Sequence, residues 1–184
     1  MPRWLTDRAI GEQSARNIRW LVLDVDGVMT DGTLLYGLPG GRMPEMKPFH
    51  VHDGHGIRLW QRSGRHVAVI TGRTSAAVAD RCADLEIARV YQGAKVKRDA
   101  LRMFLQDTGA DPATVCYVGD DMVDIPVFRG VGLGIAVADA TPETVQAAHL
   151  VTDKPGGRGA VREVIDFLLK LQGAWPKLME RYLE

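Results

Sequence analysis

The chain has 184 residues, of which 46% are hydrophobic and 25% are charged, as is ordinary for a soluble globular protein. Lys and Arg together number 23, as do Asp and Glu, so the net charge is zero and no basic field favours nucleic acid. No stretch is apolar for long enough to be a signal peptide or a membrane span, and the two cysteines have no paired spacing. We therefore expect one cytoplasmic domain over residues 1–184, with neither nucleic acid nor membrane as a partner.

Short apolar runs alternate with helical patterns along the chain. The first run, at 20–24, is followed by the turn-rich stretch GLPGGR, which predicts a β-hairpin over about 32–51. Further strands are predicted at 66–71, 88–92, 114–120, 132–137 and 149–152. Helices are predicted at 54–63, 74–85, 95–108, 121–129, 141–147 and from about 159, before a C-terminal tail at about 172–184.

The apolar runs are nearly continuous, which is typical of strands that are buried on both faces. Alternation of strand and helix favours right-handed crossovers and a parallel sheet covered by helices on both sides. The predicted fold class is therefore α/β, as a Rossmann-like three-layer α/β/α arrangement with a central parallel sheet and a projecting hairpin. The spacing leaves no room for an inserted cap domain.

Polar residues follow the predicted strands, at the sheet edge where open α/β proteins bind their ligands. They are Asp24, Asp26, Thr71, Gly72, Lys97, Asp120, Asp121 and Asp124. So many carboxylates in one place require a hard divalent cation, and ligation by oxygen alone indicates Mg²⁺. A lysine and a hydroxyl beside such a metal site fit a phosphate ligand, because both can bind its oxygens.

Four motifs occur in a fixed order: DVDGVMTDG (24–32), ITGR (70–73), Lys97 and GDDMVD (119–124). Together they resemble the motifs of the haloacid-dehalogenase (HAD) superfamily of phosphohydrolases. The resemblance implies that Asp24 is the nucleophile and Asp26 the general acid and base. It assigns phosphate binding to Thr71, Gly72 and Lys97. It assigns Mg²⁺ binding to Asp24, Asp120 and the main-chain carbonyl of Asp26, with Asp121 and Asp124 behind the metal.

Three further stretches, FHVHDGHGIR (49–58), YQGAKVK (91–97) and GGRGAVREV (156–164), are similar to one capless HAD subfamily. Its members are tetrameric phosphatases that act on 3-deoxy-D-manno-octulosonate (KDO) 8-phosphate in lipopolysaccharide precursor synthesis. The resemblance implies a homotetramer with sites near subunit interfaces, and a tail at 172–184 that reaches a neighbour's site. The substrate contacts that it implies are His50, Val51, His52, Asp53, Gly54, Arg58, Arg73, Arg81 and Arg158.

One departure from the subfamily leaves alternatives open. His52 stands where the subfamily often has arginine, which weakens the case for a carboxylate grip and leaves room for a nine-carbon, sialic-acid-like sugar 9-phosphate. HAD-like modules that only assemble tetramers are a second alternative, although the catalytic motifs are retained here. A phospho-accepting receiver domain would place its acidic pair and its phosphorylated aspartate on different strands, and is set aside.

Overall fold

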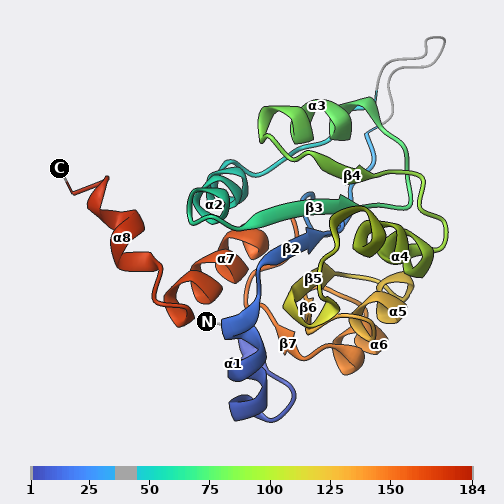
Figure 1. Cartoon of the computed structure of the whole chain (residues 1–184). Coiled ribbons are helices and arrows are strands. Elements are labelled where there is room, and N and C mark those ends of the chain that lie inside the picture. Colours follow the sequence, from blue (N-terminus) through green and yellow to red (C-terminus); the bar gives the residue numbers. More distant parts are fainter. Residues whose placement is uncertain (1, 36–44, 184) are drawn as a thin grey trace, which may run out of the picture.

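The structure is a computed structural model that describes residues 2–35 and 45–183 (Figure 1). Within these residues, seven strands form one sheet in the order β1-β7-β6-β5-β2-β3-β4. Strand β1 pairs antiparallel with β7, and every other neighbouring pair is parallel. The strands are β1 (Arg3–Trp4), β2 (Trp20–Leu23), β3 (His66–Ile70), β4 (Arg89–Tyr91), β5 (Val115–Gly119), β6 (Leu133–Ala136) and β7 (Leu150–Val151).

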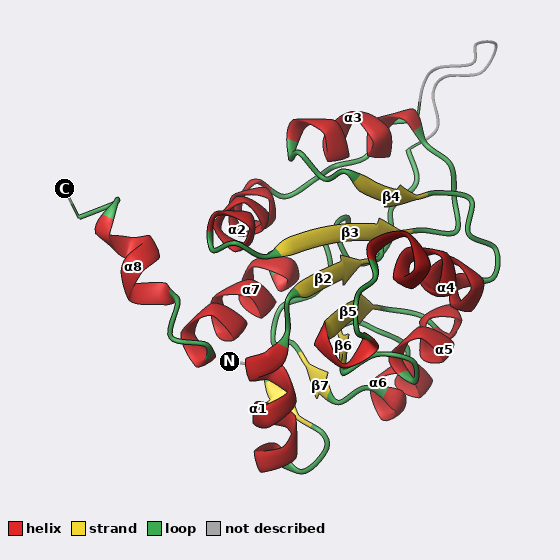
Figure 2. Cartoon of the chain, in the orientation of Figure 1, coloured by secondary structure: helices red, strands yellow, loops and turns green. Residues whose placement is uncertain are grey.

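Helices cover both faces of the sheet, which gives the expected three layers (Figure 2). One layer contains α1 (Arg8–Asn17), α2 (Val51–Arg62), α3 (Ala76–Asp84) and α7 (Ala160–Leu171). The other contains α4 (Lys97–Thr108), α5 (Ile125–Phe128) and α6 (Pro142–Ala147). Helix α8 (Trp175–Glu180) follows α7 and projects from the body of the molecule (Figure 1).

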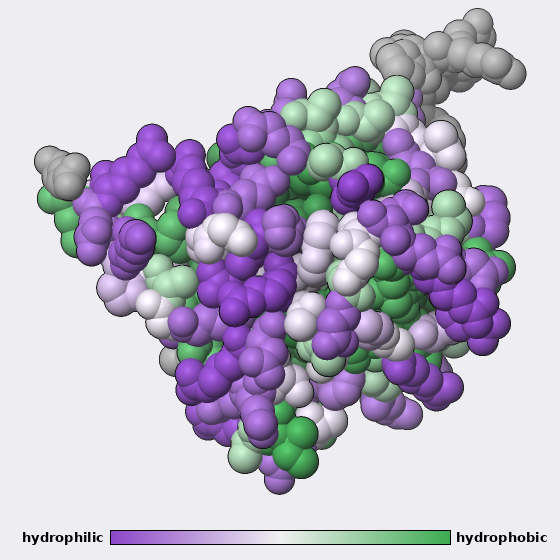
Figure 3. Space-filling view, in the orientation of Figure 1, coloured by the Kyte–Doolittle hydropathy of each residue, from purple (hydrophilic) through white to green (hydrophobic). Residues whose placement is uncertain are grey.

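Successive residues of each central strand point into opposite cores, because side chains alternate across a sheet. In β2, Leu21 and Leu23 pack in the core beneath α2 and α7, whereas Val22 packs in the core beneath α4. Both cores are apolar, which explains why these strands are continuous hydrophobic runs in the sequence. The face shown in Figure 3 is largely hydrophilic, with smaller hydrophobic areas between the polar ones. Among the described residues, the structure has no helix with the length and apolarity needed to cross a bilayer.

The predicted strands and helices are present, with shifts at their ends, and the α/β prediction is confirmed. The sequence reading omitted β1 and α8, which are short, and α1, whose sequence RAIGEQSARN contains few apolar residues. The helix predicted at 121–129 is in fact a 3₁₀ turn, Met122–Asp124, followed by α5. The predicted hairpin is described only at its base, by an antiparallel bridge between Leu35 and Met46, and its centre at 36–44 lies outside the described residues.

Helix α2 begins three residues before the predicted start, so Asp53 lies inside its first turn. The Asp53 carboxylate is buried and accepts hydrogen bonds from the backbone N–H groups of Gly159, at 3.2 Å, and Arg162, at 2.7 Å. These N–H groups belong to the start of α7 and have no partner within that helix. Asp53 therefore caps α7 from a different helix and joins two elements that form much of one core.

We expect Asp53→Ala to lower the free energy of unfolding by about 2–3 kcal/mol, because two N–H groups at the start of α7 lose their acceptor. Urea unfolding followed by circular dichroism at one protein concentration measures the change. Asp80→Ala, at an exposed position of α3, is the matched control and should change stability by less than about 1 kcal/mol. Equal effects of the two substitutions would contradict the capping role.

Candidate active site

The loop after β2 presents the first two carboxylates. The Asp24 N–H continues the sheet by donating to Val118 O at 3.1 Å, and the Asp24 carboxylate accepts from the Val25 N–H at 2.7 Å. The Val25 carbonyl then accepts from the N–H groups of the three residues at 28–30, which coils the loop tightly. Gly27 has φ +81°, and a Cβ there would collide with the Asp120 carboxylate, so this turn requires glycine.

Lys97 and Asp124 form the buried base of the site. Lys97 begins α4, and its ammonium donates to the Asp24 carboxylate and, at 2.5 Å, to Asp124 Oδ1. Asp124 also accepts a hydrogen bond from the Tyr117 hydroxyl at 2.7 Å. Its other oxygen accepts from the backbone N–H groups of Asp120, at 3.0 Å, and Asp121, at 3.2 Å. These bonds occupy both oxygens of Asp124, so its carboxylate organises the loop after β5 and holds Lys97 in place.

A hollow of about 280 Å³ opens at the carboxyl ends of β2, β3 and β5. It is lined by Asp24, Asp26, Gly27, Gly32, Thr71, Gly72, Arg73, Lys97, Asp120, Asp121 and Val123. The structure therefore brings together the nucleophile, acid–base, phosphate and metal residues that the sequence predicted, with Asp124 buried beneath them. Larger hollows elsewhere in the described structure, such as the one beside Trp20 and Arg58, do not contain this set of residues.

Burial and neighbouring charges shift the pKa values of the charged groups in this hollow. Burial and the nearby Asp124 carboxylate raise the pKa of Asp24 to about 6, although Lys97 opposes the shift. Burial, followed by repulsion from Asp24 and Asp124, raises the pKa of Asp120 to about 7. Burial alone would lower the pKa of Lys97, but the two carboxylates that it contacts outweigh burial and raise it. The Lys97 ammonium alone therefore does not balance the carboxylates of Asp24, Asp120 and Asp124.

The donor set fits a hard divalent cation. Asp24, Asp120 and Asp124 each offer a carboxylate oxygen, and these oxygens lie within 4.8 Å of one another. Because Asp124 already accepts four hydrogen bonds, Asp24 and Asp120 are the carboxylates best placed to bind a metal ion. Oxygen ligands and an excess of negative charge are what Mg²⁺ requires.

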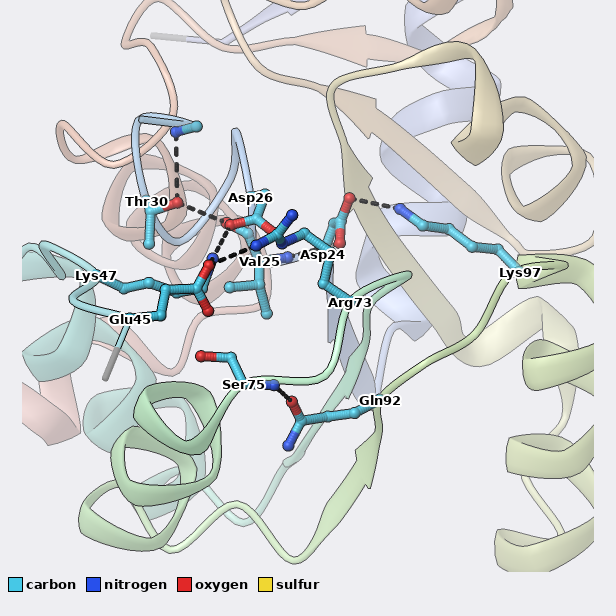
Figure 4. Close-up of polar contacts among 11 residues, drawn as sticks. Asp24, Val25, Asp26, Thr30, Glu45, Lys47, Arg73, Ser75, Gln92 and Lys97 are labelled. Atoms are coloured by element: carbon cyan, nitrogen blue, oxygen red, sulfur yellow. Dashed lines mark hydrogen bonds and ion pairs between the residues drawn. The ribbon is translucent and has the colours of Figure 1, made fainter. Parts of the chain in front are cut away.

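The sequence reading missed Lys47 and Glu45, which lie close to Asp26 and to Arg73, a residue that it did predict. Lys47, which precedes Phe49 in the chain, donates from its ammonium to Asp26 Oδ1, and Arg73 Nε lies 3.5 Å from Asp26 Oδ2 (Figure 4). Glu45 lies beside both cations, with Oε1 at 2.6 Å from Arg73 Nη2 and 3.5 Å from Lys47 Nζ. The signal in the sequence was the charged pair in PEMKPF at 44–49, which the prediction of a hairpin treated only as strand.

The predicted substrate contacts at 50–54 lie at the start of α2, outside the lining of the hollow. His50 precedes the helix, and its Nδ1 lies 3.8 Å from Asp53 Oδ2, while its ring packs edge-on against the His52 ring. Val51 is exposed, and Gly54 packs against the Arg81 guanidinium. Asp53 caps α7, so its carboxylate is engaged within the chain.

The predicted substrate arginines are divided between the hollow and other surfaces. Arg73 lines the hollow, whereas Arg81 lies over the Phe49 ring with 5.7 Å between its Cζ and the ring centroid. Arg158 pairs with Asp31 at 3.1 Å, at the far end of the loop that carries Asp24. Arg58 pairs with Glu86 at 2.8 Å and lines a hollow at the amino ends of β2 and β3, so the chain does not bring it to the site.

Comparison with known proteins agrees with this geometry. Residues 86–165 match the family model described as haloacid dehalogenase-like hydrolase. The 3-deoxy-D-manno-octulosonate 8-phosphate phosphatase of Salmonella typhi is 50% identical over 159 residues, which cover 86% of this chain and 83% of that protein.

Two solved structures are similar over nearly their whole length. The crystal structure of the 3-deoxy-D-manno-octulosonate 8-phosphate phosphatase from Yersinia pestis has a TM-score of 0.86 and 46% identity, and the match covers 91% of this chain and 89% of that one. The enzyme of the same name from Moraxella catarrhalis was solved with magnesium, phosphate and KDO. It has a TM-score of 0.89 and 35% identity, with 96% of this chain and 99% of that one covered.

Four HAD motifs meet in one hollow, and the match to the curated relative extends over most of both chains. The chain therefore belongs to the 3-deoxy-D-manno-octulosonate 8-phosphate phosphatase family of the HAD-like hydrolases.

Proposed function

We propose that this protein is a Mg²⁺-dependent phosphomonoesterase that converts KDO 8-phosphate to KDO and phosphate, in the synthesis of lipopolysaccharide precursors. The observation that carries the proposal is the contact of the Lys97 ammonium with both Asp24 and Asp124, at the bottom of an acidic hollow. A buried lysine in that place holds the nucleophile and can bind a phosphate oxygen at the same time. The relatives named for this reaction support the choice of substrate.

The proposed first step is attack by an Asp24 carboxylate oxygen on phosphorus. A bond forms between that oxygen and phosphorus, the bond from phosphorus to the sugar oxygen breaks, and Asp26 gives a proton to the leaving alcohol. Thr71 donates a hydrogen bond and Lys97 a charged hydrogen bond to the phosphoryl oxygens. Asp24, Asp120 and the Asp26 main-chain carbonyl would hold Mg²⁺, which would supply positive charge beside the phosphoryl oxygens when bound.

The proposed second step is hydrolysis of the aspartyl-phosphate. Asp26, now a carboxylate, takes a proton from a water molecule, whose oxygen attacks phosphorus. The bond between phosphorus and the Asp24 oxygen then breaks, so phosphate leaves and the nucleophile is restored. Lys97 remains bound to Asp124 throughout and keeps the Asp24 side chain aligned for the next turnover.

The assembly proposed for the active protein is a homotetramer with its sites near subunit interfaces. Arg158 is mostly exposed and pairs with Asp31 at the end of the loop that carries Asp24, so its guanidinium is open to a neighbouring subunit, which is the role that the family resemblance implies. Location in the cytoplasm stays a prediction from the sequence.

Because His52 replaces the arginine that the subfamily often has, a nine-carbon sugar 9-phosphate is the second candidate substrate.

Phosphate release from a panel of sugar phosphates, with Mg²⁺ and with EDTA, tests the proposed function. We expect KDO 8-phosphate to be hydrolysed well above the nine-carbon 9-phosphates, and EDTA to abolish release, because the acidic site needs its cation. Even activity over the panel would retain the chemistry and contradict the substrate. Absence of metal-dependent activity on every compound would favour the non-catalytic, tetramer-forming alternative.

Asp24→Asn should lower turnover at least about 10³-fold, because the amide cannot form the phosphorylated intermediate. The fold should be retained with an unchanged or higher melting temperature, since the substitution removes a buried carboxylate that repels Asp124 and leaves Lys97 paired with Asp124. Asp99→Asn, at an exposed carboxylate of α4, is the control and should keep wild-type turnover. Substantial activity of a well-folded Asp24→Asn protein would refute the nucleophile assignment.

Asp120→Asn should raise the Mg²⁺ concentration for half-maximal activity by about 10- to 100-fold or more, because one ligand loses its charge. A second readout needs no substrate: Mg²⁺ should raise the melting temperature of the wild-type protein and raise that of Asp120→Asn much less. An equal thermal shift in both proteins would show that Asp120 is not a ligand.

A further inference from the structure

Lys47 is an almost completely buried cation outside the four HAD motifs. Its side chain is 1% exposed, and among the described residues its ammonium contacts Asp26 and Glu45. Figure 4 shows Lys47 and Glu45 approaching Asp26 from the left and Arg73 from the right, while Lys97 points toward Asp24 from the far right. The site therefore has two lysines, one on each of the paired aspartates.

A buried ammonium is costly unless a carboxylate accepts from it. The contact between Lys47 and Asp26 is consequently a fixed feature of the site rather than a mobile surface pair, which would be worth little. Asp26 itself is more open, with 24% of its side chain exposed toward the hollow. The buried lysine thus anchors an aspartate whose other side faces the reaction space.

The two oxygens of Asp26 have different surroundings. Oδ1 accepts from Lys47, whereas the neighbour of Oδ2 is Arg73 Nε at the longer distance of 3.5 Å. Arg73 is held in turn by Glu45 at 2.6 Å. Oδ1 is therefore the anchored oxygen, and Oδ2 is the oxygen that remains able to exchange a proton with a ligand.

We propose that Lys47 is a positioning residue for the reaction, which fixes Asp26 through Oδ1 so that Oδ2 meets the oxygen of the leaving alcohol. This inference rests on the proposed acid–base role of Asp26. When the phosphorus–oxygen bond breaks, its electron pair stays on the sugar oxygen, and that oxygen takes the proton from Oδ2. The carboxylate that results is balanced by the Lys47 ammonium already in contact with it.

A purely structural role for Lys47 has a different signature. If Lys47 only fastened residues 45–49 to the site, its loss would slow every substrate alike. Loss of a positioned general acid instead slows substrates whose leaving group needs a proton, such as a sugar alcohol. It spares p-nitrophenyl phosphate, whose phenolate leaves without one. The ratio of kcat/KM for the two substrates separates the roles, because kcat/KM covers only the steps up to formation of the phosphorylated Asp24.

The experiment compares Lys47→Met with the wild-type protein on KDO 8-phosphate and on p-nitrophenyl phosphate. We expect kcat/KM to fall about 10- to 100-fold for the sugar phosphate and less than about threefold for the aryl phosphate. Lys47→Arg, which keeps a cation, should recover most of the loss. Arg8→Met removes a cation from an exposed pair on α1 and should leave both values unchanged. If Lys47→Met does not fold, Lys47→Gln takes its place.

Equal losses on the two substrates, or no loss, would overturn the positioning role. Asp26→Asn is measured in parallel to separate this failure from failure of the proposed function. A selective loss in Asp26→Asn without one in Lys47→Met overturns only the inference about Lys47. A wild-type protein inactive on both substrates, or an Asp26→Asn variant without selectivity, removes the acid–base role itself and the inference with it. Adding Lys47→Met to Asp26→Asn should cause no further selective loss.

Discussion

The contact of one lysine with two buried aspartates is the interaction on which the rest of the site depends. Asp24, Lys97 and Asp124 come from the end of β2, the start of α4 and the loop after β5, and they meet where water is largely excluded. None of the three could be buried alone, because an isolated charge in the interior is strongly unfavourable. Their mutual pairing therefore aligns three separate elements, and the parallel sheet provides the edge at which they can meet.

This arrangement leaves the site short of positive charge. Burial is the main cause of the raised pKa values of Asp24, about 6, and Asp120, about 7, and repulsion from neighbouring carboxylates adds to it. A site with balanced charge would be more stable by itself and would bind a divalent cation less well. The protein therefore retains uncompensated negative charge at the site, which a bound cation can neutralise. Functional sites often retain such charge at a cost in stability.

Much of this architecture follows from the sequence in a direct way. The buried strands are continuous apolar runs, and the polar residues that end them had to meet at one edge, so the α/β fold and the residues of the hollow were predictable. The roles of Asp53 and Lys47 were not, because each depends on a partner distant in the chain. Asp53 caps α7, more than 100 positions later, and Lys47 reaches Asp26 from a segment that carries no motif. Local patterns contain no information on such pairings. Short elements such as β1 and α8 were missed for a similar reason, because their position depends on packing rather than on a pattern in the sequence.

The contact between the two glycines at 27 and 156 has a consequence for how the protein becomes active. A Cβ at Gly156 would overlap the Gly27 carbonyl, and the Gly157 N–H donates to Val28 O at 2.9 Å. Nearby, Arg158 and Asp31 pair across 127 positions of sequence. The loop that carries Asp24 is thus closed by residues that follow it by more than 100 positions in the sequence. A chain that stops before Gly156 therefore holds all four HAD motifs but lacks the backbone contacts that close the nucleophile loop, so the motifs alone do not complete the catalytic site.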